Sequence, residues 1–361
     1  MSRFSVAITI YLFLDNLLFA QSGTFKVDTI PLFDKPTLYC DLGDSIVTPD
    51  AMAIDGQGRL FLSVPNFANR ALGSKICVIT DDHQVQTWFD TLPKHPLSDA
   101  VFPMGIEFGR DGALYIADAQ SPVNGKAIGR LLRVIIRNGK PLRTEVLVEG
   151  FSSANGLRIF GNSVFISDSY IPIKGKRSQS GIYSFDFDEF KKGKIMLREN
   201  VEDSHLVCLF SCREENGKEC MGGADGLAFD SKGNLYAGNF NDGVISRIVL
   251  DKKGKALEQR VIINSDKFKC CDGMFYDKKS NSIFIANFAN NSVHRLNLSD
   301  HKLELIWENG DAGDDSALLD QPCEPILYKE QLLVVNFDSF VGFKNKAVDS
   351  KHTISAFRLK R

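Results

Sequence analysis

The sequence lacks several features that mark common classes of protein. It has no basic block, since 43 Lys and Arg stand against 45 Asp and Glu and the formal net charge is −2. That balance gives no electrostatic footprint for nucleic-acid binding. We find no Gly-x-Ser-x-Gly, His-Glu-x-x-His or Gly-x-x-x-x-Gly-Lys motif. Beyond the N-terminus, no apolar run approaches the about 20 residues needed to span a bilayer. These absences argue against nucleic-acid binding, serine-hydrolase, zinc-protease or nucleotide chemistry, and membrane spans.

The N-terminus has the pattern of a secretory signal. Arg3 supplies a positive charge, "FSVAITIYLFL" supplies an apolar region, and "LFA" offers a cleavage site at Ala20. Asp15 and Asn16 interrupt the apolar run. The alternatives are a buried first strand or an uncleaved anchor. We predict a signal peptide over 1–20 and a secreted or periplasmic protein that is free of the membrane after cleavage.

Eight cysteines fit an oxidising compartment, so disulfides are expected. Their pairing is not readable, because eight cysteines allow 105 full pairings. Cys270, Cys271 and Cys323 each lie just before a repeated acidic position. A bridge between these sites is a hypothesis for bracing that part of the molecule.

One phrase recurs along the chain. "ANGLRIFGNSVFISDS" begins at Ala154 and "ADGLAFDSKGNLYAGNF" begins at Ala224. Each places a polar residue and a glycine before two short apolar stretches, and four further copies follow the same plan at intervals of 47 to 70 residues. In chain order, the slot before the first apolar stretch holds Asp50, Met104, Asn155, Asp225, Asp272 and Glu324. Such a period indicates a repeat architecture.

Each copy has the pattern of four short strands. Apolar runs of about five residues between turns rich in Gly, Asp, Asn and Lys are typical of strands. Four antiparallel strands repeated at roughly 50 residues are typical of propeller blades. The last copy lacks a fourth strand, and residues 36–43 offer one. We predict an all-β, six-bladed β-propeller over 21–361, closed by an N-terminal outer strand that completes the last blade. We interpret 191–221 as an insert, a long connection lying over one face.

The recurring slot predicts a ring of side chains at one mouth of the central channel. Four of the six slot residues are carboxylates, one is an amide, and none is Lys or Arg. Carboxylates that converge repel each other, and a bound cation removes the conflict. Oxygen ligands without His or Cys favour Ca²⁺ first, then Mg²⁺ or Mn²⁺. The alternative is that Asp-Gly and Asn-Gly only form turns.

These motifs resemble the senescence marker protein/gluconolactonase (regucalcin-like) family of calcium-dependent lactonases on six-bladed propellers. In that family a Glu, two Asn and an Asp from separate blades hold one metal. "NGL" at Asn155, "DGL" at Asp225 and "CEP" at Glu324 are similar to three of those ligands. Met104 stands near the place of the other Asn, so Asp50 and Asp272 are the further ligand candidates.

The resemblance also implies a reaction. The metal would polarise the carbonyl of a small lactone and stabilise the oxyanion while water attacks. Asp225 matches the family's metal-binding Asp that is also proposed as the base. The expectation is a secreted, metal-dependent, gluconolactonase-like hydrolase.

Further substrate contacts are expected at the ends of the second strands, which point to the same mouth. These positions hold Asn66, Asp118, Asp168, Asn239, Asn287 and Asn336. The alternative is that they cap turns. His205 in the insert is a further candidate for substrate contact or general base, and a zinc site with the nearby cysteines is an alternative that its spacing disfavours.

Two other functions stay open. A non-catalytic binding propeller would hold a protein or glycan on its loops, and Met104 in the ring favours it. A strictosidine-synthase-like enzyme would need a lone Glu in an apolar pocket, which a polar ring opposes. Fold alone does not decide among them.

Overall fold

The computed structural model describes residues 31–171, 179–198, 203–211, 223–265, 268–313, 315–338, 341–347 and 351–359. The signal peptide expected over 1–20 lies outside these residues and stays a prediction. Within the described parts of the chain, no helix has the length and apolar character that a membrane crossing requires. The helical turns found there are three short 3₁₀ segments, η1 (Arg70–Leu72), η2 (Glu189–Lys192) and η3 (Phe288–Asn290).

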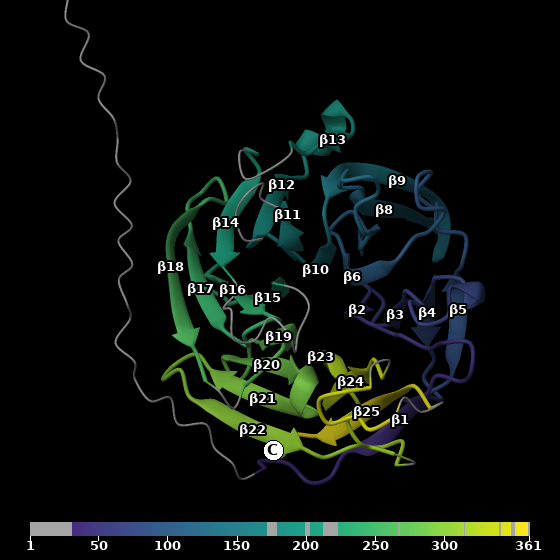
Figure 1. Cartoon of the computed structure of the whole chain (residues 1–361), viewed down its shortest axis with the longest axis vertical. Helices are drawn as coiled ribbons and strands as arrows, with labels where there is room; N and C mark the ends of the chain where they lie inside the picture. The colour runs from purple at the N-terminus through teal and green to yellow at the C-terminus, as the bar shows by residue number, and fades with distance from the viewer. Residues whose placement is uncertain are drawn as a thin grey trace, which may run out of the picture.

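Six sheets surround a central axis, and each forms one blade (Figure 1), so the predicted six-bladed β-propeller is confirmed. Blade 1 contains β2 (Met52–Ile54), β3 (Leu60–Val64), β4 (Lys75–Ile79) and β5 (Val85–Phe89). Blade 2 contains β6 (Pro103–Phe108), β7 (Leu114–Asp118), β8 (Gly129–Arg137) and β9 (Lys140–Phe151). Blade 3 contains β10 (Ala154–Phe160), β11 (Ser163–Ile171), β12 (Gln179–Asp186) and β14 (Leu206–Ser211).

Blades 4 to 6 follow the same plan, with the first strand of each blade nearest the axis. Blade 4 contains β15 (Ala224–Phe229), β16 (Leu235–Asn239), β17 (Ile245–Leu250) and β18 (Ala256–Ile263). Blade 5 contains β19 (Cys271–Asp277), β20 (Ser282–Asn287), β21 (Ser292–Asn297) and β22 (Leu303–Glu308). Blade 6 contains β23 (Pro322–Tyr328), β24 (Gln331–Asn336) and β25 (Thr353–Arg358), with β1 (Thr37–Asp41) outermost. The inner strands contact one another around the ring, including β23 with β2.

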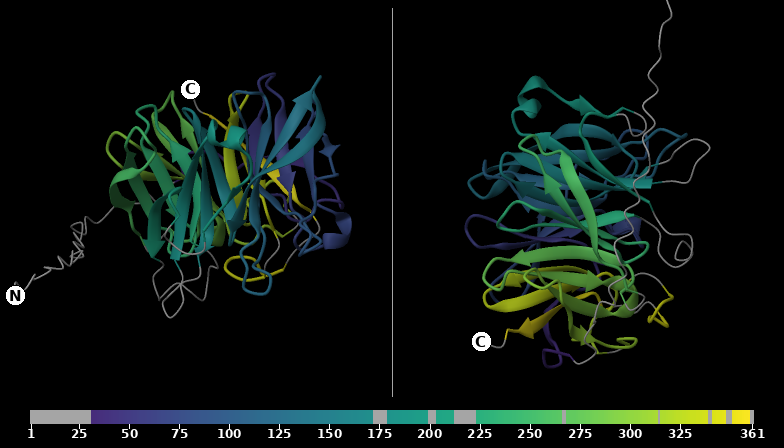
Figure 2. Two further views of the ribbon diagram at one scale, coloured as in Figure 1. Left: turned by 90° about the horizontal axis from the view of Figure 1, so that it is seen from above. Right: turned by 90° about the vertical axis from the view of Figure 1, so that its left-hand side faces the viewer.

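The sheet of blade 6 joins the two ends of the described chain. β1 pairs antiparallel with β25, with Thr37 opposite Ala356 and Asp41 opposite Thr353. Figure 1 shows the purple β1 beside the yellow β25. In the side views of Figure 2, the sheets of the blades stand next to one another around the ring. Pairing with β1 covers an edge of β25 that would otherwise be open to other chains.

Part of the segment interpreted as an insert belongs to the blades. β14 pairs with β12 as the outer strand of blade 3, and β13 (Ile195–Met196) adds in parallel to β9 of blade 2. The interpretation of 191–221 as a connection over one face is therefore wrong for these residues. "LVCLFS" is a short apolar run that pairs with the outer edge of β12. The neighbouring charged residues and cysteines made the whole segment resemble a loop, so the strand was not predicted.

Apolar side chains of neighbouring blades pack against each other, and six clusters fill the spaces between blades. Between blades 1 and 2, the Phe61 ring lies 5.1 Å from Trp88 and 5.0 Å from Phe108. Between blades 3 and 4, Phe165 packs in one cluster with Leu235. Each blade is thereby held on both sides, which fixes the inner strands relative to one another.

The repeated Asp-Gly or Asn-Gly dipeptide forms a bulge in an inner strand, so the alternative of a simple turn is wrong for these copies. In β10, Ala154 pairs with Asp168 and Leu157 with Ile166, so Asn155 and Gly156 together oppose one residue. β15 and β19 have the same shift. A bulge re-aims the side chain it contains. A Cβ on Gly156 would lie 2.2 Å from the Asp225 carbonyl oxygen. The glycine therefore lets adjacent inner strands approach.

We expect Gly156→Ala to lower the free energy of unfolding by about 2–3 kcal/mol or more, because the added methyl group must push β10 and β15 apart. The measurement is urea-induced unfolding. Gly56→Ala is the matched control, because a Cβ there would meet nothing within 4 Å. Equal effects of the two substitutions would contradict the close-approach explanation.

Candidate active site at the channel mouth

Five of the six slot residues meet at the floor of one cavity. Its volume is about 1030 Å³, and Asp50, Met104, Asn155, Asp225 and Asp272 line it. A second cavity of about 10 Å³ lies deeper along the channel and is lined by four of these residues and by Glu324. That volume is close to what one water molecule needs. The predicted ring therefore exists, with Glu324 one level below the floor of the larger cavity.

The walls of the larger cavity differ in character from blade to blade. On blades 4 to 6, the Phe288 ring lies 5.3 Å from Phe240, 6.0 Å from Phe337 and 6.3 Å from Phe343. Blades 2 and 3 contribute hydroxyl groups instead, at Ser121, Ser152, Ser153 and Ser169. The cavity thus offers an aromatic wall and a hydroxyl-rich wall above an acidic floor. Such a site suits a small molecule with one apolar face and one polar face.

Burial and mutual repulsion disfavour charge on the acids of the floor. Burial raises the pKa of Asp225 to about 8, and the nearby Glu324 carboxylate adds to this effect. Burial also raises the pKa of Asp50 and of Asp272 well above the usual range, and Asp225 and Glu324 add to both shifts. Without a positive charge between them, burial and mutual repulsion thus favour the protonated form of these acids.

Asn155 connects two blades across the floor. Its Nδ2 donates to Asp225 Oδ2 at 2.7 Å and to Ser169 Oγ at 3.3 Å. Ser169 Oγ in turn donates to the Ala224 carbonyl at 2.8 Å. This chain of hydrogen bonds holds Asp225 in place from the neighbouring blade.

A positively charged side chain that the slot pattern did not predict, Arg158, lies directly beneath the floor. Arg158 of β10 forms an ion pair with Glu324, and its guanidinium also donates to the carbonyl oxygens of Leu157 at 2.7 Å and Met274 at 2.6 Å. The prediction was limited to the slots, so it missed this residue. The sequence contains a signal for it, because the position three residues after the slot is Glu107 in blade 2 and Arg158 in blade 3.

Glu107 completes this group. Its Oε2 accepts the Ile159 N–H at 2.7 Å. Burial raises the Glu107 pKa to about 7, while the positive charge of Arg158 acts in the opposite direction. The channel below the floor therefore contains two carboxyl groups around one guanidinium.

The donor set fits a hard divalent cation in its chemistry. Asp50, Asn155, Asp225 and Asp272 carry carboxylate or amide oxygens, which Ca²⁺ and Mg²⁺ prefer. Burial raises the pKa of these acids and their mutual repulsion adds to the shift, and a cation would relieve that repulsion. As they stand, no three His, Cys, Asp or Glu side chains of the described residues form a group that could hold a metal ion. These side chains would have to move closer to coordinate one.

The polar residues at the ends of the second strands lie behind the cavity wall. All six are at most 3% exposed, and none lines the cavity: Asn66, Asp118, Asp168, Asn239, Asn287 and Asn336. Asp168 accepts the N–H groups of Ser152 at 2.9 Å and Ser153 at 2.7 Å, and Asn66 accepts that of Val47 at 3.0 Å. Four of the six, Asn66, Asp118, Asp168 and Asn336, therefore cap the loop that enters their own blade, which is the alternative to substrate contact.

The other asparagines at the ends of the second strands differ in their hydrogen-bond partners. Asn336 accepts the Asp320 N–H at 3.0 Å and Asn239 accepts that of Asn241 at 3.1 Å. The Asn287 amide has no hydrogen-bond partner within the described parts of the chain.

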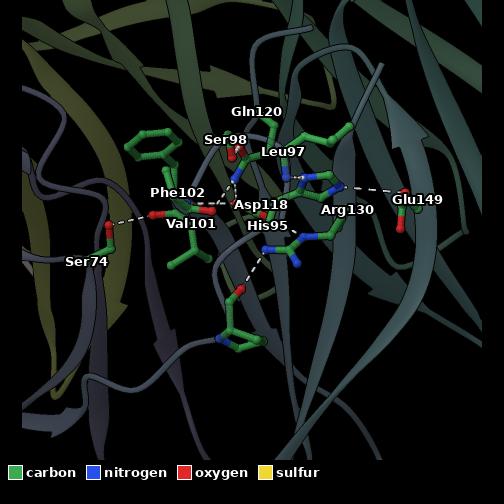
Figure 3. A network of polar contacts seen from close by, with 12 residues as sticks. Ser74, His95, Leu97, Ser98, Val101, Phe102, Asp118, Gln120, Arg130 and Glu149 are labelled. Carbon is green, nitrogen blue, oxygen red and sulfur yellow. Dashed lines mark hydrogen bonds and ion pairs between the residues drawn. The ribbon is translucent and has the colours of Figure 1, made fainter. Parts of the chain in front are cut away.

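Asp118 forms the most extensive of these capping networks (Figure 3). It accepts the Phe102 N–H at 2.7 Å, Gln120 Nε2 at 2.8 Å and Arg130 Nε at 2.6 Å. Arg130 also donates to the Pro93 carbonyl at 2.7 Å. Asp118 and Arg130 are 0% and 3% exposed, so this is a buried ion pair that fixes the loop before β6.

His205 does not reach the mouth, so its predicted contact with substrate is wrong. It lies just before β14, whose other end, Ser211, pairs with Gln179 on the mouth side of blade 3. Its Nδ1 lies 2.7 Å from Asp203 Oδ1 and its Nε2 lies 3.2 Å from Glu189 Oε1. The strand geometry thus carries His205 to the opposite face, away from the cavity.

The hypothesis of a disulfide that braces the mouth is wrong for Cys271 and Cys323, since both are free thiols, whereas Cys270 is disulfide-bonded. Cys323 instead donates its S–H to the Asp50 carbonyl at 3.1 Å, which links blade 6 to blade 1. Burial raises the pKa of both thiols. Cys40, Cys77 and Cys208 are also free and buried.

No known protein-family model matches the chain, and no curated protein sequence is detectably similar. Solved structures share its fold. A luciferin-regenerating enzyme superimposes with a TM-score of 0.59 at 11% identity, covering 90% of this chain and 95% of its own.

Two further structures are similar at the same level. A protein described as a candidate gluconolactonase gives 0.54 at 14% identity over 91% and 93% of the two chains. The PQQ-bound aldose sugar dehydrogenase of Streptomyces coelicolor gives 0.57 at 13% identity over 91% and 99%. The fold that the sequence resemblance implied is therefore the fold observed: this chain is a six-bladed β-propeller built like those of a luciferin-regenerating enzyme and a candidate gluconolactonase.

Proposed function

We propose that the protein is a hydrolase of small lactones that acts at the channel mouth with a divalent cation, Ca²⁺ first. The observation that carries the proposal is the convergence of Asp50, Asn155, Asp225 and Asp272 at the floor of a cavity of about 1030 Å³. A floor of buried acids with raised pKa values in a cleft is typical of a functional site. Enzymes are among the proteins with this fold, including a candidate gluconolactonase.

The floor residues would divide the work by position. Asp50, Asp225, Asp272 and the Asn155 amide would hold the cation, and Glu324 lies one level below them. When bound, the cation supplies polarisation of the ester carbonyl and charge for the developing oxyanion.

Asp225 is the residue we assign as proton acceptor. In the cation-free protein, burial raises the pKa of this carboxyl group to about 8, which supports a role in taking up a proton. A general base works best when its pKa is close to the working pH. Asn155 would keep it oriented through the 2.7 Å hydrogen bond to Oδ2. Asp225 would thus take the proton of the attacking water.

The walls would select the substrate. The phenylalanines of blades 4 to 6 would contact an apolar face of the lactone, and the serine hydroxyls of blades 2 and 3 would bond its polar groups. Lactones with a hydrocarbon or aromatic portion should therefore be hydrolysed at least as well as the highly hydroxylated glucono-δ-lactone.

The test is hydrolysis of glucono-δ-lactone, δ-valerolactone and dihydrocoumarin by the purified protein, followed by acid release. We expect turnover of at least one lactone, a fall of at least about tenfold with EDTA, and recovery when Ca²⁺, Mg²⁺ or Mn²⁺ is added back. Turnover that is indifferent to EDTA would refute the role of the cation. No turnover of any of the three would favour a non-catalytic binding propeller.

A further inference from the structure

Arg158 spans the channel from its own blade to two others. It starts on β10 of blade 3, bonds the Met274 carbonyl of blade 5 and forms an ion pair with Glu324 of blade 6. The Arg158 and Glu324 side chains are 16% and 10% exposed. The guanidinium thus lies in the channel wall, where it faces the same small cavity as the floor acids.

This contact changes what Glu324 can do. A guanidinium stays protonated in proteins, so the positive charge beside Glu324 is permanent. Oε1 of Glu324 already accepts a hydrogen bond from Arg158 Nη2. A divalent ion that used Glu324 would have to break this bond or lie close to a second positive charge, which costs energy in a poorly solvated channel.

We propose that Arg158 is a built-in counter-cation that removes Glu324 from the cation-binding set. The ion site of this chain then consists of Asp50, Asn155, Asp225 and Asp272, and Arg158 lowers its affinity for divalent ions. The inference rests on the cation part of the proposed function. It also departs from the resemblance, which assigns Glu324 as a metal ligand.

A purely structural strut would behave differently. If Arg158 only braced the channel, its loss would loosen the floor and weaken cation binding. If Arg158 is a counter-cation, its loss frees a fourth carboxylate, and cation binding becomes tighter although the cation-free protein is less stable. The sign of the change in affinity separates the two roles.

The experiment titrates CaCl₂ and MnCl₂ into the full chain by calorimetry and measures melting temperatures with and without each salt. For Glu324→Gln, which keeps an oxygen acceptor for Arg158 but leaves the guanidinium charge uncompensated, we expect weaker cation binding than in the wild-type protein. For Arg158→Met we expect at least about tenfold tighter binding and a larger cation-induced rise in melting temperature. The double variant should return to the wild-type affinity, because the freed carboxylate is gone.

Three outcomes would overturn the inference. They are a loss of affinity of tenfold or more in the double variant, unchanged or weaker binding in folded Arg158→Met, and no binding of either salt by any variant. The double variant, which removes both partners of the ion pair, keeps the test decisive if Arg158→Met does not fold. Lactone turnover by the wild-type protein is scored separately. If the wild-type protein shows cation-dependent turnover but the variants do not show the expected changes in affinity, this inference alone is refuted. If the affinities change as expected but no lactone is hydrolysed, only the proposed lactonase activity is refuted.

Discussion

Asp225→Asn should abolish lactone hydrolysis and, in cation-free buffer at neutral pH, make the folded protein more stable. We expect turnover to fall by about 10³-fold or more, because the substitution removes both a proton acceptor and one charge of the cation site. Asn at this position can still accept the hydrogen bond that Asn155 donates to Oδ2. The packing of the floor is therefore kept while the titrating group is lost.

The gain in stability should depend on pH. Because the Asp225 pKa is about 8 in the folded protein and near its usual value of 3.8 in the unfolded chain, the folded state binds the extra proton between these limits. Stability from this group is fully present below about pH 4 and is lost as the pH rises toward 8. The variant does not titrate, so its advantage should grow from about zero at pH 4 to the order of 1–4 kcal/mol at pH 8.

The measurement is urea-induced unfolding from pH 4 to pH 8 in EDTA, with lactone turnover recorded in parallel. Glu258→Gln is the matched control, because it makes the same carboxylate-to-amide change at an exposed position of blade 4. The control should show no growing advantage and normal turnover. A stability advantage that does not change with pH would contradict the assignment of the shift to Asp225.

The blades could be predicted because each blade repeats one local pattern. Short apolar runs and turns mark the strands wherever they stand alone, as in "GLAFDSKGNLYAGNF". The outer strand of blade 3 was missed because Leu206–Ser211 contains Cys208 and is flanked by charged residues and Cys212. The conformation of that segment depends on its pairing partner, because β14 forms a strand by pairing with the open edge of β12.

The candidate site could be predicted only in part, because sequence pattern reports periodicity and not the direction of a side chain. The slots located Asp50, Asn155, Asp225 and Asp272 correctly, since their repeat places them around the axis. Arg158 follows a bulge, and a bulge shifts which face the next residues present. Its partner Glu324 is 166 residues away, so no local pattern could have paired them.

The second large effect is expected for Asp118. Its replacement should make the protein much less stable without directly affecting the hydrolysis reaction. Asp118→Ala leaves Arg130, 3% exposed, without its carboxylate and removes the acceptor of the Phe102 N–H. Removing one partner of a buried ion pair costs about 3–5 kcal/mol, because the other charge stays buried and uncompensated. We expect a fall in melting temperature on the order of 10 °C.

Asp81→Ala provides the comparison, because it also removes an Asp from an ion pair, here with Lys329 at the exposed surface. It should leave the melting temperature almost unchanged, since exposed pairs contribute little. In the double variant Asp118→Leu/Arg130→Met, apolar side chains replace both charges, so much of the lost stability should return. KM for the lactone in folded Asp118→Ala decides between the two roles considered for this residue. An unchanged KM fits a residue that caps the loop before β6, whereas a KM raised tenfold in fully folded protein would mean that Asp118 contacts the substrate after all.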